Sequence, residues 1–176
     1  MGYLFLIVAG WATYGLFRMV RDGNESRRYL AASAAEPPLK TGHLAPPLAR
    51  LVADTRLLRI SLEAPVLRVK ELRAGDLDTA STEDLDAFDN MLMNLSRQIA
   101  DWLHAVDRLP PAEKASMQDL GLGPEALRTA LENEGWSFDR RNLRGPGKPM
   151  DERLQHVIME LHRVETMLQT TRRPYR

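Results

Sequence analysis

The residues best suited to metal chemistry are His156, Glu160 and His162, near the end of the chain. His156 and Glu160 are four residues apart, so a helix would place them on one face, whereas His162 would fall on a different one. The zinc-protease spacing His-Glu-x-x-His is absent. We therefore interpret these residues as solvated helix positions, and we predict no metal site.

Other catalytic chemistry has little support in the residues. Cysteine is absent, and no serine stands in a recognisable nucleophile motif. The segment 117–124 holds two glycines, but the Gly-Lys-Ser/Thr of a phosphate-binding loop is missing. The many acidic residues single out no catalytic carboxylate pair. The sequence thus favours a protein that is not an enzyme and that holds no cofactor.

The most distinctive stretch is the apolar start of the chain, Gly2–Val20. Sixteen consecutive residues, from Gly2 to Phe17, carry no charge. A helix over residues 3–20 would span about 27 Å, close to the roughly 30 Å of a bilayer core. Arg18 falls inside this count, but its long side chain can reach the headgroups. We predict a single-pass membrane anchor over residues 1–22.

Two alternatives compete with the anchor. A secretory signal peptide would use Ala32-Ser33-Ala34 as a cleavage site, but no Lys or Arg precedes the apolar core. A buried core helix is the other alternative, since the apolar run is short for a membrane span. For the anchor, the arginines that follow it predict an outside N-terminus and a cytoplasmic C-terminal domain, in a bacterial inner membrane.

Small and aromatic residues occur near the middle of the predicted anchor. Ala9 and Thr13 form a small-xxx-small step, which lets a second helix approach closely. Trp11 and Tyr14 fall near mid-depth, away from the interfaces where such aromatics usually gather. We predict that these four residues pack against other membrane-protein subunits, or against a bound lipid or pigment.

Charge is distributed unevenly although the chain is neutral overall. Residues 18–73 carry a net charge of +5, residues 74–139 a net −10 and residues 140–176 a net +5. The acidic centre and the lack of a basic run with interleaved aromatics argue against nucleic acid. An anionic lipid surface or an acidic partner suits the basic blocks. The predicted contact residues are Arg18, Arg21, Arg27, Arg28, Arg140, Arg141, Arg144 and Lys148.

A linker is predicted over residues 23–47, because Pro37-Pro38, Gly42 and Pro46-Pro47 interrupt regular structure. It acts either as a mobile tether or as a strap along a partner. A helix then continues to about Glu63, followed by a break at Pro65 and a short helix ending at Gly75. A β-hairpin over residues 57–73 is the alternative, since Leu58, Ile60 and Leu62 alternate at the strand period.

Two long helices follow from heptad spacing. The first, residues 82–109, opens with Ser81 or Thr82 as its cap and widens its stripe with Met91 and Leu103, which predicts more than one partner helix. The second runs from Met150 to about Thr171 and is expected to pack on the first or on a further chain. The seam residues are Leu85, Phe88, Leu92, Leu95, Ile99, Trp102, Val106 and Leu109, then Met150, Leu154, Val157, Leu161, Val164 and Leu168.

Between these helices the sequence predicts two short ones, residues 112–120 closed by Gly121 and residues 124–134 opened by Pro124. Trp136 and Phe138 are expected to pack this bend onto the bundle. The predicted fold is all-α: an N-terminal membrane helix, a Pro-rich linker and a helical domain over residues 48–176. We expect an accessory subunit of a membrane complex, or alternatively a membrane-tethered adaptor.

Overall fold

The computed structural model describes residues 36–74, 81–133, 138 and 148–171. The chain divides into two compact units, Met1–Pro38 and Leu39–Arg176. In the described part of the second unit every regular element is a helix, which confirms the all-α prediction for this region. Residues 39–47, assigned to the linker from sequence, belong to the same unit as the helices.

The first helix pair is α2, Pro46–Ser61, and α3, Glu63–Ala74. Pro46 and Pro47 stand in the first turn of α2, where a missing N–H costs nothing. Pro65 has no N–H to bond the carbonyl of Ser61, and the two helices separate at Leu62. Residues 57–73 are therefore helical on either side of Leu62, and the hairpin alternative is wrong. The alternating Leu58, Ile60 and Leu62 are all buried, as a helix wedged between several neighbours allows.

The long helix α4, Thr82–Asp107, begins as its sequence predicts. The Ser81 hydroxyl accepts a hydrogen bond from the Asp84 N–H (3.1 Å) and donates to Asp84 Oδ2 (2.7 Å). Glu83 and Asp84 lie in the first turn, where the helix dipole favours negative charge. Ser81 is thus the cap, and it satisfies one of the free N–H groups at the helix start.

The bend that follows contains α5, Pro111–Asp119, and α6, Pro124–Asn133. Gly121 has a φ of +68°, a conformation that favours glycine. The Leu122 N–H bonds the Met117 carbonyl at 2.8 Å and the Gly121 N–H bonds that of Gln118 at 2.9 Å, which is a Schellman closure. The predicted stop at Gly121 is confirmed.

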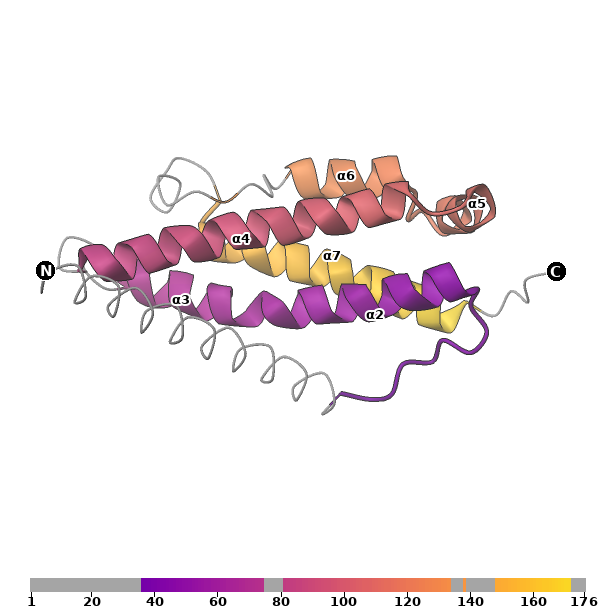
Figure 1. The fold of residues 1–176 in the computed structure, drawn as a ribbon, viewed down its shortest axis with the longest axis horizontal. Coiled ribbons are helices and arrows are strands. Elements are labelled where there is room, and N and C mark those ends of the chain that lie inside the picture. Colours follow the sequence, from indigo (N-terminus) through magenta and orange to yellow (C-terminus); the bar gives the residue numbers. More distant parts are fainter. Residues whose placement is uncertain (1–35, 75–80, 134–137, 139–147, 172–176) are drawn as a thin grey trace, which may run out of the picture. The chain divides into compact units, whose positions relative to one another are not determined.

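The last helix, α7, Met150–Thr170, makes its most extensive contacts with α2, followed by α3 and α6. Figure 1 shows α7 behind α4, with α2 and α3 end to end along it. Its main partner is therefore α2 and not the predicted helix over residues 82–109. Heptad spacing reveals an apolar face, but it does not say which helix covers that face.

One apolar core joins the helices of this unit. All six seam residues of α7 are buried, and in α4 every seam residue from Phe88 onward is buried too. α4 contacts both α2 and α6, as its widened stripe predicts. Phe138 is buried and packs in this core as expected, while Trp136 lies outside the described residues.

Replacing Ser81 by Ala should destabilise the bundle by about 1 kcal/mol, because the α4 cap is lost. Denaturant unfolding of the full chain in mild detergent measures this difference. Thr82→Ala, one residue further on, is the matched control and should change stability by less than about 0.5 kcal/mol. Equal effects of the two substitutions would contradict the assignment of Ser81 as the cap.

Candidate functional site

Most of the residues that the sequence singles out as contacts lie outside the described part of the chain. This applies to Ala9, Trp11, Thr13, Tyr14, Arg18, Arg21, Arg27, Arg28, Arg140, Arg141 and Arg144, and to the membrane helix over residues 1–22. Lys148 is described, and it is exposed just before α7. Among the described residues, no helix is both long enough and apolar enough to cross a bilayer.

The predicted solvated cluster near the C-terminus lies on α7. Glu160 bonds Arg163 one turn away, at 2.8 Å, and His162 is exposed. His156 is half-buried. Within the described ranges, no group of histidine, cysteine and acidic residues is arranged to hold a metal ion.

A buried cluster of charges between α2 and α7 was not found from sequence. Glu165 Oε1 accepts from Arg56 Nε at 2.8 Å and from Arg56 Nη2 at 2.6 Å. Its other oxygen, Oε2, accepts from Arg59 Nε at 3.1 Å. All three side chains are at most about one-tenth exposed. We call Arg56, Arg59 and Glu165 the charge cluster.

Amphipathic spacing explains why these charges are buried. Arg56 follows Val52 by four residues and Arg59 follows Thr55 by four, so both extend the buried face of α2. Glu165 follows Leu161 by four residues on α7. The signal available in the sequence was two positive charges beside one apolar stripe and a negative charge beside another. Only the tertiary structure shows that these residues pair.

The charge cluster joins α2 to α7 through the Glu165 carboxylate. A buried carboxylate is tolerated when hydrogen-bond donors surround it, and both oxygens of Glu165 accept such bonds. Arg59 also lies 4.0 Å from the exposed Glu63, one turn along. The carboxylate is thus committed to α2, which sets the register of the two helices.

A second buried polar contact connects α2 to α4. Trp102 Nε1 donates to the Thr55 hydroxyl at 2.9 Å, and that hydroxyl donates to the Leu51 carbonyl at 2.6 Å. Thr55 is fully buried and Trp102 nearly so. Both polar groups are therefore satisfied within the core, and they fix the position of α4 along α2.

Phe138 makes contacts through both its backbone N–H and its ring. The Phe138 N–H donates to the Ser96 hydroxyl at 3.0 Å. The guanidinium of Arg153 lies 5.3 Å from the centre of the Phe138 ring, within range of a cation–π interaction. Near the C-terminal end of α4, Arg128 of α6 pairs with Asp107 at 2.6 Å.

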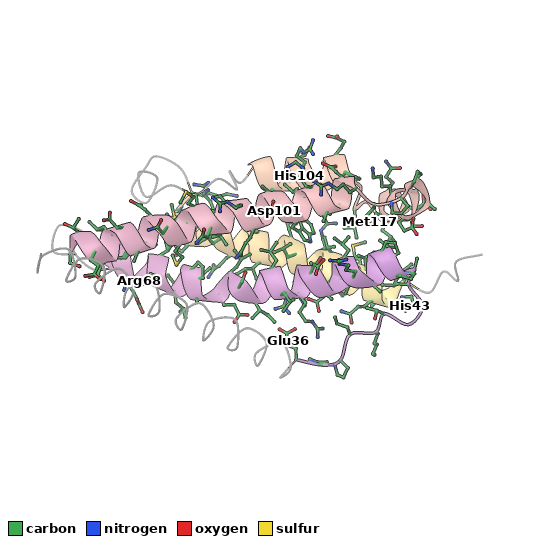
Figure 2. All side chains as sticks on the ribbon, in the orientation of Figure 1. Glu36, His43, Arg68, Asp101, His104 and Met117 are labelled. Carbon is green, nitrogen blue, oxygen red and sulfur yellow. The ribbon has the colours of Figure 1, made fainter. Side chains whose placement is uncertain are left out.

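Large apolar side chains are exposed on four helices. Leu57 is 38% exposed on α2, Leu67 61% on α3, Met93 53% on α4 and Met159 67% on α7. Figure 2 shows the side chains of the bundle, with Arg68 of α3 among those labelled. Arg68 pairs with Glu71 at 3.1 Å and lies 3.7 Å from Asp84 of α4, so polar contacts accompany Leu67 on this helix.

Comparison with protein-family models, with curated proteins and with solved structures returned no match.

Changing Glu165 to Ala should destabilise the bundle by about 3–5 kcal/mol, because two buried guanidinium groups lose their carboxylate. Glu160→Ala, on the same helix, breaks a more exposed pair and should cost less than about 1 kcal/mol. Denaturant unfolding compares the two variants.

The triple change Arg56→Met, Arg59→Leu and Glu165→Met tests the same account from the other side. It should cost less than Glu165→Ala alone, because no charge then stays buried without its partner. A triple variant less stable than Glu165→Ala would show that the cluster itself, and not the unpaired charge, supplies the stability.

Proposed function

We propose that this protein is a non-catalytic accessory subunit of a multi-subunit membrane complex, such as a respiratory or photosynthetic one. The observation that carries the proposal is the uncharged run Gly2–Phe17, joined to a domain of amphipathic helices. The run binds other subunits within the bilayer, through Ala9, Trp11, Thr13 and Tyr14. A bound lipid or pigment shares this surface.

The role of the helical domain follows from its packing. The sequence left open whether a further chain covers the apolar seam of α7. In the structure the seams of α4 and α7 are buried within the bundle. Association therefore falls to the anchor and to the surface of the domain, including the basic residues on either side of it. Exposed Leu57, Leu67, Met93 and Met159 offer apolar contact points there.

In the proposed topology the N-terminus lies outside and the helical domain lies in the cytoplasm, at a bacterial inner membrane. Arg18, Arg21, Arg27 and Arg28 follow the anchor and favour the cytoplasmic side, where anionic headgroups attract them. Arg140, Arg141, Arg144 and Lys148 contact the same surface or an acidic partner.

Purification from native membranes in mild detergent tests the proposal. The full chain should elute with other membrane subunits, and recovery as a single monodisperse monomer would overturn the idea.

Ala9→Leu should reduce the co-purified partners by roughly fivefold or more, because a larger side chain prevents close helix approach. Val8→Leu is the matched control, because in the predicted helix Val8 lies about 100° around from Ala9 and outside the faces of the four packing residues, and it should leave recovery unchanged.

The alternative function is a membrane-tethered adaptor that recruits a soluble partner, as in division or secretion systems. The glycine and prolines of residues 23–38 favour it, because linkers of such composition give reach. In that case protease should cut the segment 23–35 readily in native membranes. Protection of this segment, lost only when the complex is dissolved, would favour the accessory subunit instead.

A further inference from the structure

The segment that leads into α2 is held on the end of the bundle. We call residues 39–45 the strap. Leu39 and Leu44 are partly buried and pack against the apolar core. A turn closes between them, in which the Leu44 N–H bonds the Thr41 carbonyl at 2.9 Å. The strap therefore has apolar contacts at both ends and an internal hydrogen bond.

Two hydrogen bonds join the strap to the last turn of α7, more than a hundred residues away in sequence. The Lys40 N–H donates to Gln169 Oε1 at 2.9 Å. His43 Nε2 lies 3.2 Å from the Leu168 carbonyl, one of the helix-end acceptors that lack a partner within α7. Figure 2 labels His43 at this end of the bundle, where α2 begins and α7 ends.

Gln169 uses its other amide atom inside the bundle. Its Nε2 donates to Glu165 Oε1 at 3.2 Å, and that oxygen also accepts both bonds from Arg56. One side-chain amide thus connects the backbone of the strap to the buried charge cluster. When the strap leaves, Gln169 loses the bond that orients it, and Glu165 loses part of its donor set.

We propose that the strap and the charge cluster open as one unit, with Gln169 as the latch between them. Three hydrogen bonds of ordinary length make this connection: strap backbone to Gln169 amide, Gln169 amide to Glu165 carboxylate, and Arg56 guanidinium to the same carboxylate. Because the polypeptide enters the bundle through the strap, a partner that binds residues before Leu39 acts on the α2–α7 contact through this latch. Binding at residues before Leu39 would therefore change the packing of α2 against α7.

Hydrogen exchange of the full chain in mild detergent tests the latch. The readouts are the Lys40 and Leu44 amides in the strap and the Arg56 Nε–H in the cluster, all followed by NMR. Gln169→Ala should speed exchange at all three by about fivefold, the equivalent of one net hydrogen bond. Thr170→Ala is the matched control, since its hydroxyl bonds only carbonyls within α7. It should change none of the three.

A second variant approaches the latch from the strap. Leu44→Ala weakens an apolar contact of the strap and leaves all three residues of the charge cluster in place. It should speed exchange of the strap amides and, by several-fold, of the Arg56 Nε–H, while the Ile99 amide in α4 keeps its rate. If the strap opens and Arg56 is unchanged, or if Ile99 speeds up equally because the whole bundle has loosened, the latch is refuted.

Discussion

A buried carboxylate stands at the centre of the α2–α7 contact, and its needs constrain the rest of the bundle. Glu165 is 3% exposed, and such a charge is stable in a core only when donors meet its oxygens. Arg56 and Arg59 supply those donors from one face of α2. A shift of one helix by a turn would separate the two arginines from Glu165. Contacts between Leu and Val side chains would tolerate the same shift. The charges therefore select one register among several apolar ones.

A buried polar contact also fixes the position of the neighbouring helix, α4. The Thr55 hydroxyl, one residue before Arg56, accepts from Trp102 and so places α4 against α2. α6 then packs along α4, with Arg128 and Asp107 paired near the end of that helix. Apolar burial supplies most of the driving force for this bundle. The buried contacts Arg56–Glu165, Arg59–Glu165 and Thr55–Trp102 each connect two helices and so fix their relative position.

These features are consistent with the proposed accessory role, in which the domain holds a position. Both oxygens of Glu165 accept hydrogen bonds, from α2 and from Gln169. The proposed association lies in the apolar start and the basic flanks of the chain. The strap connects the N-terminal part of the sequence to the bundle. Its contacts with α7 therefore bear on how the proposed anchor and the helical domain work together.

Over the described residues, the sequence by itself determined most of the local structure. Heptad spacing, Ser81, Pro65 and Gly121 defined where helices begin, break and end, because such signals act over a few residues. The tertiary structure decided what those helices pack against. It made α2 the main partner of α7, and it brought Arg56 to Glu165 and Lys40 to Gln169 across more than a hundred residues. Periodicity reports that a face is apolar, but the identity of its partner depends on packing and charge from the whole chain.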